Sequence, residues 1–287
     1  MIKIAVASGK GGTGKTMLAG NLAVFLSKQF KVLLTDLDVE EPNSSFFVKG
    51  NESLVTEAFK SIPQWKQETC VLCGKCAENC NFHAVIRLGP NISVFNQLCH
   101  SCFACSELCP TDSLPMGKHK IGEIRHVENI NSILIEGKLQ IGEEQAVPLI
   151  RQTRQYAVNY FSNAEIQIYD CPPGNSCPVV AAVEEADYVL LVTEPTPFGL
   201  NDLKIAVETM ENLGKRIGVV INRDGTGNNE VEKFCTNKQI EVVGKILYDR
   251  RIAESYARGE LVFNKIGHLN QSVQNIAENL IKKFSHV

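Results

Sequence analysis

The fold of this chain is decided by its first stretch, Ile2-Lys3-Ile4-Ala5-Val6-Ala7-Ser8-Gly9-Lys10-Gly11-Gly12-Thr13-Gly14-Lys15-Thr16. Residues 2–8 are mostly apolar and predict a buried strand, and the apolar spacing after residue 16 predicts a helix. A strand, a glycine-rich loop and a helix in this order form a phosphate-binding loop, because the glycines let backbone N–H groups turn inward around phosphate oxygens. In such a loop Lys15 reaches the β- and γ-phosphates, and the Thr16 hydroxyl binds Mg²⁺.

The remaining sequence alternates strands with helices, which predicts an α/β fold with a mostly parallel sheet. Apolar runs predict strands at 31–36, 166–170, 187–193, 216–221 and 240–247. Amphipathic spacing predicts helices at 199–213, 229–237, 250–258 and 268–284. The stretch 272–284 carries only two adjacent lysines, so we expect it to pack on the core rather than on a membrane.

Composition narrows the range of partners. The 287 residues are 44% hydrophobic and 21% charged, with a net charge of −3, as in an ordinary globular protein. No basic field points to nucleic acid, and no apolar stretch is long enough to span a membrane. Residues 1–7 read as a first strand rather than a secretory signal, so we expect a cytoplasmic protein with reduced cysteines.

Eight of the eleven cysteines form two runs with the same spacing, C-x2-C-x2-C-x3-C. This is the spacing of bacterial two-cluster ferredoxins, in which the fourth cysteine of each run binds the cluster of the other run. It predicts one 4Fe–4S cluster on Cys70, Cys73, Cys76 and Cys109, and a second on Cys80, Cys99, Cys102 and Cys105. A zinc site needs only four ligands and gives no reason for a third cysteine at each interval, and disulfides are not expected without a secretory signal.

The cysteine runs lie in a segment that interrupts the α/β pattern. Residues 63–118 are rich in Cys, Pro and Asn and lack a helical period. We therefore predict a P-loop ATPase domain made of residues 1–62 and 119–287, with an inserted ferredoxin-like domain at 63–118. Residues 121–141 alternate apolar and polar side chains and predict a hairpin that leads back to the main domain. Asn81 departs from the ferredoxin pattern, because a proline usually follows the fourth cysteine.

Four segments carry a resemblance to a known family. With its second lysine, Lys10, the glycine-rich loop resembles the deviant Walker A motif of the MinD/ParA class of P-loop ATPases. Residues 34–38 resemble the strand end that follows the first helix in this class, and residues 169–174 resemble its Walker B and switch II segment. Residues 220–223 resemble its base-reading strand end. The whole chain is similar to MinD-superfamily ATPases that contain an inserted two-cluster ferredoxin domain.

The resemblance implies a role for each matching residue. Lys10 crosses a sandwich dimer to the partner's nucleotide, and Asp38 orients the attacking water. Asp170 holds Mg²⁺ through water, the backbone N–H of Gly174 senses the γ-phosphate, and Asn222 binds adenine. The implied catalytic residues are Lys10, Lys15 and Asp38. The implied nucleotide-binding set is Gly9, Lys10, Gly11, Gly12, Thr13, Gly14, Lys15, Thr16, Met17, Gly174 and Asn222. For Asp36 a site role and a local structural role both stay open.

Three cysteines lie outside the two runs. Cys171 and Cys235 are expected to be small buried side chains. Cys177 stands seven residues after Asp170, a spacing that resembles the cluster-binding cysteine of the nitrogenase iron protein. A cluster shared between subunits at Cys177 is therefore an alternative to a plain free thiol.

The leading hypothesis is a cytoplasmic Mg-ATPase that couples nucleotide-driven dimer closure to electron transfer through two 4Fe–4S clusters. Its expected cofactors are ATP, Mg²⁺ and the two clusters. We expect a homodimer or a heterodimer with a close paralogue, and an unidentified redox partner protein or metallocofactor as electron acceptor. The main alternative is an assembly or carrier ATPase that delivers clusters or metal to an apo-metalloprotein. A partitioning or positioning ATPase with a structural ferredoxin part is a third, weaker hypothesis.

Overall fold

The computed structural model describes residues 1–48, 50–128, 132–261 and 265–284. The chain forms two compact units. The first unit consists of Met1–Thr56, Ile124–Lys138 and Ile150–Val287, and the second unit consists of Glu57–Glu123 and Leu139–Leu149. The glycine-rich loop belongs to the first unit, and both cysteine runs belong to the second.

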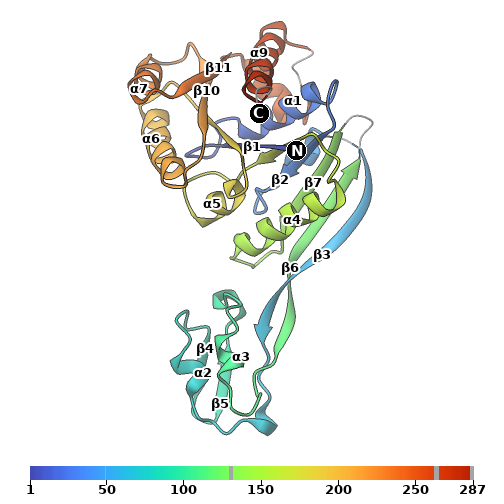
Figure 1. Ribbon diagram of the computed structural model, residues 1–287, viewed down its shortest axis with the longest axis vertical. Coiled ribbons are helices and arrows are strands. Elements are labelled where there is room, and N and C mark those ends of the chain that lie inside the picture. Colours follow the sequence, from blue (N-terminus) through green and yellow to red (C-terminus); the bar gives the residue numbers. More distant parts are fainter. Residues whose placement is uncertain (49, 129–131, 262–264, 285–287) are drawn as a thin grey trace. The chain divides into compact units, whose positions relative to one another are not determined.

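The elements are labelled in Figure 1. The strands are β1 (Ile2–Ala7), β2 (Val32–Asp36), β3 (Asn51–Pro63), β4 (Val85–Leu88), β5 (Asn91–Val94), β6 (Met116–Glu128), β7 (Ser132–Leu139), β8 (Ile166–Asp170), β9 (Tyr188–Thr193), β10 (Ile217–Asp224) and β11 (Glu241–Leu247). The helices are α1 (Lys15–Leu26), α2 (Lys75–Glu78), α3 (Ala104–Glu107), α4 (Ala146–Tyr160), α5 (Cys177–Val183), α6 (Pro197–Asn212), α7 (Glu230–Lys238), α8 (Arg250–Ala257) and α9 (Gly267–Phe284). Every strand and helix predicted in the main domain is present.

The large sheet has the strand order β11-β10-β9-β1-β8-β2-β7-β6-β3. Strand β1 lies between β8 and β9 and pairs with both in parallel. Strand β2 likewise pairs in parallel with β7 and β8. All residues of β2, β8 and β9 are buried, as expected for parallel strands that are covered on both faces. The predicted α/β fold with a mostly parallel sheet is confirmed.

Helices α1 and α9 contact each other and share one core with the sheet (Figure 1). Leu18 and Leu22 of α1 and Val273 and Ile276 of α9 are completely buried in this core. The sequence prediction that the C-terminal helix packs on the core is therefore confirmed. Within the described ranges, no helix combines the length and apolarity that crossing a membrane requires.

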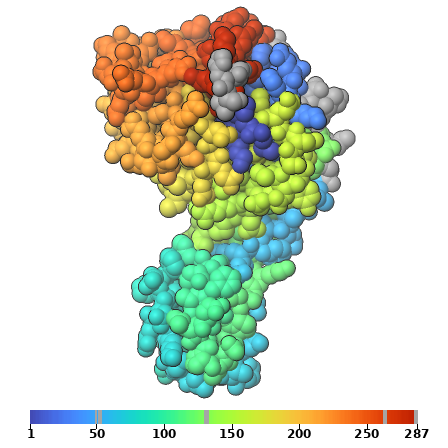
Figure 2. Space-filling view, viewed as in Figure 1, coloured from blue at the N-terminus to red at the C-terminus, as the bar shows by residue number. Residues whose placement is uncertain are grey.

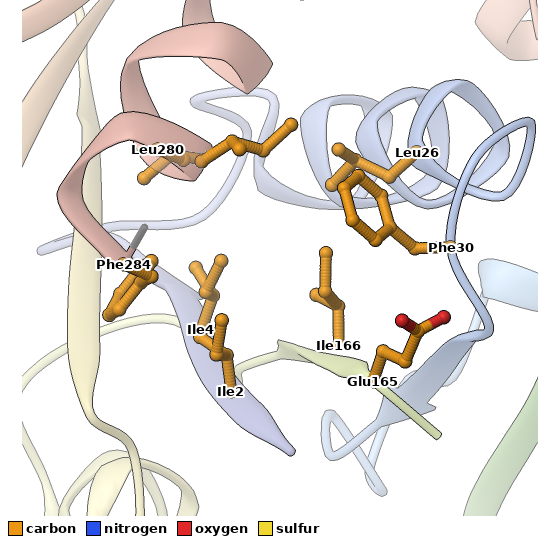
Figure 3. A pocket seen from close by; sticks show the side chains of 9 residues that line it. Ile2, Ile4, Leu26, Phe30, Glu165, Ile166, Leu280 and Phe284 are labelled. Atoms are coloured by element: carbon orange, nitrogen blue, oxygen red, sulfur yellow. The ribbon is translucent and has the colours of Figure 1, made fainter. Parts of the chain in front are cut away.

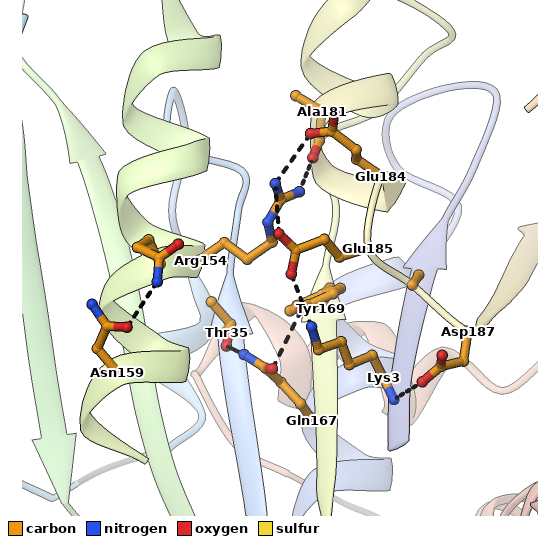
Figure 4. A network of polar contacts seen from close by, with 12 residues as sticks. Lys3, Thr35, Arg154, Asn159, Gln167, Tyr169, Ala181, Glu184, Glu185 and Asp187 are labelled. Carbon is orange, nitrogen blue, oxygen red and sulfur yellow. Dashed lines mark hydrogen bonds and ion pairs between the residues drawn. The ribbon is translucent and has the colours of Figure 1, made fainter. Parts of the chain in front are cut away.

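Polar side chains of α4, β2 and β8 form a network of hydrogen bonds and ion pairs with their neighbours (Figure 4). Arg154 of α4 is 5% exposed, and its guanidinium donates to the carbonyl oxygen of Ala181 at 2.5 Å and to the Glu184 carboxylate at 3.1 Å. On the strands nearby, the Gln167 amide donates to the Thr35 hydroxyl at 2.9 Å. The Arg154 contacts attach α4 to α5, the helix that follows β8 and its loop, and the Gln167 contact joins β8 to β2.

An apolar cavity of about 170 Å³ lies at the start of β1 (Figure 3). Its lining residues are Ile2, Ile4, Leu26, Phe30, Glu165, Ile166, Leu280, Ile281 and Phe284. Glu165 is the charged member, and its carboxylate accepts a hydrogen bond from the backbone N–H of Lys31 at 2.9 Å. The glycine-rich loop follows the other end of β1, so this cavity is separate from the predicted phosphate site.

The second unit contains little regular structure. Its short helices α2 and α3 contact each other, and β4 and β5 form an antiparallel pair. Its core contains two cysteines together with Val85, Ile92 and Leu114. In the space-filling view the side chains of residues 64–115 form a closely packed body (Figure 2).

Strand β3 and helix α4 were not predicted from the sequence. In β3 the buried positions alternate as Ala58, Lys60 and Ile62, so a charged residue occupies a core-facing position. The Lys60 ammonium lies 2.8 Å from the Glu143 carboxylate, and both side chains are almost completely buried. A buried ion pair of this kind masks the apolar alternation on which strand prediction depends.

Candidate nucleotide and cluster sites

The glycine-rich loop connects β1 to α1, as the sequence predicts. Gly14 is the residue before α1 and has φ 97°, a left-handed conformation that favours glycine. A Cβ at this position would also collide with the side-chain nitrogen of Asn222. Lys15 and Thr16 open the helix and are mostly buried, with 7% and 8% of their surface exposed. The loop therefore presents a helix N-terminus with a lysine and a hydroxyl beside it, which is the donor set of a phosphate site.

Side chains in the last part of β10, together with Glu194 directly after β9, hold the loop in place. The Asn222 amide donates to the carbonyl oxygen of Thr13 at 2.7 Å, and the Arg223 guanidinium donates to the carbonyl oxygen of Gly12 at 3.2 Å. Arg223 also lies 2.8 Å from the Glu194 carboxylate, which lies 3.5 Å from the Lys10 ammonium. Glu194 thus holds two cations at the rim of the loop.

A cavity of about 320 Å³ opens beside the loop. Seven of the predicted nucleotide-binding residues line it, namely Gly11, Gly12, Gly14, Lys15, Thr16, Met17 and Asn222. Asp38 lines it as well, together with Pro173 of the predicted switch II segment. The opposite wall comes from α8 and the residues before it: Leu247, Tyr248, Asp249, Ile252, Ala253 and Tyr256. The structure therefore brings the loop, Asp38 and Asn222 together around one cavity.

The charge of Lys15 acts on two carboxyl groups, that of Asp38 in the cavity lining and that of the buried Asp170. Burial raises the pKa of Asp38 to about 6, although the Lys15 ammonium opposes the rise. Burial likewise raises the pKa of Asp170 to about 7, against a hydrogen bond from Thr16 and the charge of Lys15. The Lys15 charge thus favours the ionised form of both carboxyl groups, against the effect of burial.

Asp36 has a structural role in the described chain. Its carboxylate accepts hydrogen bonds from the backbone N–H groups of Asp38 at 3.0 Å, Asn43 at 3.1 Å and Ser44 at 2.9 Å. Burial and the neighbouring Asp170 charge raise its pKa well above the ordinary value. Of the two interpretations left open by the sequence, the local one accounts for these bonds, because they fix the loop that positions Asp38.

The oxygen atoms at Thr16 and Asp170 fit a Mg²⁺ ion. Asp170 is completely buried, and its Oδ1 has no hydrogen-bond partner among the described residues. The Thr16 hydroxyl hydrogen-bonds the same carboxyl group. Hydroxyl and carboxylate oxygens are ligands that Mg²⁺ prefers, and a buried carboxylate oxygen without a partner is explained by a cation.

The backbone of Gly174 is engaged within the first unit. Its N–H donates to the carbonyl oxygen of Ser8 at 3.0 Å, and its φ is 96°. The predicted contact with a γ-phosphate requires this bond to break, so the sensing role stays a prediction. Gly9 is also close-packed, because a Cβ there would collide with the backbone of Asp202.

Sequence reasoning missed Glu194 and the wall formed by α8. Glu194 directly follows β9, which neighbours β1, and the carboxyl ends of adjacent parallel strands meet at one edge of a sheet. This rule on adjacent parallel strands would have identified Glu194 as a candidate site residue. Tyr256 hydrogen-bonds the Thr16 hydroxyl, but nothing in its local sequence indicates this contact.

The eight run cysteines line two separate cavities in the second unit. Cys70, Cys73, Cys76 and Cys109 line one, and Cys80, Cys99, Cys102 and Cys105 line the other. We call these the Cys109 cavity and the Cys80 cavity. Each contains three cysteines of one run and the fourth cysteine of the other run. The grouping of the side chains is the one that the spacing predicts, while cluster binding stays a prediction.

A single metal ion and a 4Fe–4S cluster require different spacings of their cysteine ligands. Among the residues that the structure describes, no three His, Cys, Asp or Glu side chains converge closely enough for one metal ion. A 4Fe–4S cluster holds its cysteines further apart, because each thiolate binds a different iron atom of the cube. Wider spacing is therefore what a cluster requires.

The remaining cysteines differ in exposure. Cys171 and Cys235 are buried, as predicted. Cys177 is exposed at the start of α5, and a shared cluster at this position stays a prediction.

Comparisons with known proteins agree with the geometry of the first unit. Residues 4–262 match the model of the CobQ/CobB/MinD/ParA nucleotide binding domain. An uncharacterized protein of Methanocaldococcus jannaschii is 34% identical over 98% of both chains. An iron-sulfur cluster carrier protein of Pyrococcus furiosus is 24% identical over 99% of this chain and 87% of its own length.

The comparison with solved structures shows a similar fold. The septum site-determining protein MinD of Pyrococcus horikoshii, complexed with Mg-ADP, superposes with a TM-score of 0.62 and 18% identity over 97% of this chain and 95% of that one. The glycine-rich loop, its cavity and the family match lead to one conclusion. The chain belongs to the CobQ/CobB/MinD/ParA nucleotide-binding family.

Proposed function

We propose that this protein is a Mg-ATPase that uses nucleotide-dependent dimerisation to control electron transfer through two 4Fe–4S clusters. The observation that carries the proposal is the sorting of eight cysteines into two cavities of four, in a chain that also contains a phosphate-binding loop. Clusters held by four cysteines each, in a chain that also binds a nucleotide, would indicate a redox protein whose state depends on the nucleotide.

The residues around the large cavity supply the parts that ATP hydrolysis needs. The loop N–H groups and Lys15 bind the phosphates, and Thr16 with Asp170 would hold Mg²⁺. Bound Mg²⁺ neutralises charge on the phosphate oxygens during phosphoryl transfer. Asp38 lies at the cavity and holds the attacking water, and the α8 wall with Asn222 receives the base.

A substitution of Lys10 tests the proposed sandwich dimer. In the described chain its ammonium lies 3.5 Å from Glu194 and its side chain is 35% exposed, so a small rotation frees it for a partner's nucleotide. We expect Lys10→Ala to bind ATP with near-normal affinity but to lose ATP-dependent dimerisation and hydrolysis, as measured by sedimentation and phosphate release. Lys28→Ala, which removes a lysine just after α1, is the control. Dimerisation and turnover by the Lys10 variant at wild-type levels would refute the sandwich dimer.

Coupling between nucleotide and clusters is the test of the whole proposal. We expect MgATP to change the reduction potential or the EPR line shape of the clusters in the anaerobic full-length protein. A shift of about 30 mV in a one-electron couple corresponds to about 0.7 kcal/mol, which is within the usual range of coupling between sites. Lys15→Ala should abolish the shift while both clusters remain. Identical potentials with and without MgATP would reject the coupling.

A cluster carrier is the second candidate. It is favoured by the Pyrococcus furiosus relative, which is named an iron-sulfur cluster carrier protein. A carrier releases its cluster to an apo-protein, whereas a redox protein keeps it. Incubation of the loaded protein with an apo-ferredoxin and a chelator, with and without MgATP, separates the two candidates. Transfer of iron that depends on MgATP would favour the carrier.

A further inference from the structure

The two cysteine cavities are built by equivalent halves of the second unit. The Cys80 sulfur accepts a hydrogen bond from the backbone N–H four residues later, that of Ala84, at 3.2 Å. The Cys109 sulfur accepts from the N–H of Ser113, also four residues later, at 3.1 Å. Backbone conformation repeats as well, since residues 72 and 101 have φ 55° and 54°, and residues 83 and 112 have φ 52° and 50°. Differences between the cavities therefore come from side chains.

The Cys109 cavity carries a chain of three hydroxyl groups. The Thr111 hydroxyl lies 3.8 Å from the Cys109 sulfur and 2.7 Å from the Ser113 hydroxyl, which lies 2.8 Å from that of Thr69. A thiolate can only accept, so with a metal-bound Cys109 the Thr111 hydroxyl donates to sulfur, Ser113 donates to Thr111 and Thr69 donates to Ser113. Chains of aligned hydrogen bonds polarise one another, which strengthens the bond that ends at sulfur.

The three positions in the other half of the second unit that are equivalent to Thr69, Thr111 and Ser113 carry no hydroxyl group. Position 111 corresponds to Phe82, position 113 to Ala84, and position 69 to Leu98. The Phe82 ring stacks on the His100 ring at a centroid distance of 3.9 Å, beside the Cys80 cavity. The Cys80 sulfur thus has apolar side chains where the Cys109 sulfur has hydrogen-bond donors.

The position of one lysine differs between the cavities in the same sense. Lys75, between the second and third cysteines of the first run, lines the Cys109 cavity. The equivalent residue of the second run is Ala104, which lines the Cys80 cavity. Donors and positive charge near the sulfurs both favour the reduced form of a cluster, because reduction adds negative charge.

We infer that the two clusters have different reduction potentials, and that the hydroxyl chain of Thr69, Thr111 and Ser113 gives the Cys109 cavity the higher one. The inference rests on the proposed function, because it requires a cluster in each cavity. A chain that carries one electron then holds it mainly at the Cys109 cavity. The Cys80 cavity holds the stronger reductant.

The test is an EPR-monitored redox titration of the anaerobic full-length protein. We expect two separated reduction steps in the wild type, with Cys76→Ser losing the step at higher potential. Thr111→Val should change the reduction equilibrium of that step by about tenfold, which is about 59 mV downward for a one-electron couple, and leave the lower step unchanged. Thr111→Ser keeps the hydroxyl and should retain the wild-type value. Ser93→Ala, on β5 and outside both cavity linings, is the control.

A reciprocal variant, which adds hydroxyl groups to the other cavity, keeps the inference testable if Thr111→Val does not fold. Phe82→Thr with Ala84→Ser introduces hydroxyls beside Cys80, and we expect the lower step to move upward. Two clusters with one common potential in the wild type would overturn the inference and leave the proposed function intact, as would unchanged steps in both variants. A wild-type protein without iron and sulfide would overturn the proposed function itself.

Discussion

Lys15→Ala should lower the affinity for ATP by about two orders of magnitude, or about 2.7 kcal/mol. Lys15 is mostly buried at the start of α1, and its charge favours the ionised form of both Asp38 and Asp170. A charge-assisted hydrogen bond contributes about 1.5–3 kcal/mol, and without Lys15 the negative charges of Asp38, Asp170 and ATP face each other unbalanced. Isothermal titration with MgATP measures the loss.

Thermal unfolding separates this loss of binding from a loss of fold. Nucleotide at about 100 times its dissociation constant stabilises the wild type by about 2.7 kcal/mol, and this increment should disappear in the variant. Lys28→Ala, at the far end of α1, should keep it. A Lys15 variant that still gains stability from MgATP at wild-type concentrations would show that the phosphate site lies elsewhere.

Cys109→Ser should halve the iron content of the anaerobic protein, from about eight atoms per chain to about four, because each 4Fe–4S cluster holds four. Cys109 lines the cavity of Cys70, Cys73 and Cys76, although it stands in the other run of the sequence. Without Cys109 one iron atom of that cluster lacks its thiolate ligand, so we expect the whole cluster to be lost. Iron and sulfide analysis with EPR of the remaining cluster measures the result.

Double variants make the pairing unambiguous. Cys109→Ser with Cys76→Ser removes two ligands of the same cluster, so about four iron atoms should remain. Cys109→Ser with Cys105→Ser removes one ligand of each, so iron should fall close to zero. Cys177→Ser, at an exposed thiol in the first unit, should keep the full content. If the first double variant lost all its iron and the second kept half, the fourth ligands would not be exchanged between runs.

The sequence predicted the parts of the molecule whose structure depends on local patterns. The glycine-rich loop, α1 and the buried parallel strands follow from glycine positions and apolar runs, since β2, β8 and β9 are buried along their whole length. Cysteine spacing predicted which side chains gather in each cavity. These features lie within short windows of the chain.

Other features depend on contacts between distant residues and were not predictable in this way. Lys60 occupies a core position of β3 because Glu143, far along the chain, neutralises it. Asp36 looked ambiguous because its partners, the N–H groups of Asn43 and Ser44, are supplied by a turn whose shape the sequence does not show. Tyr256 reaches Thr16 only because α8 lies beside the loop.

The strand order has a consequence for the way the chain folds during synthesis. The N-terminal strands β1 and β2 do not pair with each other, since β8 lies between them and Ile2 pairs with Ile166. The ribosome must therefore make more than half of the chain before the first strand finds a neighbour. Contacts within residues 64–115 are much more local and form earlier. If the cysteines bind clusters as proposed, the ligands of both clusters are complete on the nascent chain before the nucleotide site exists, so iron delivery would precede ATP binding.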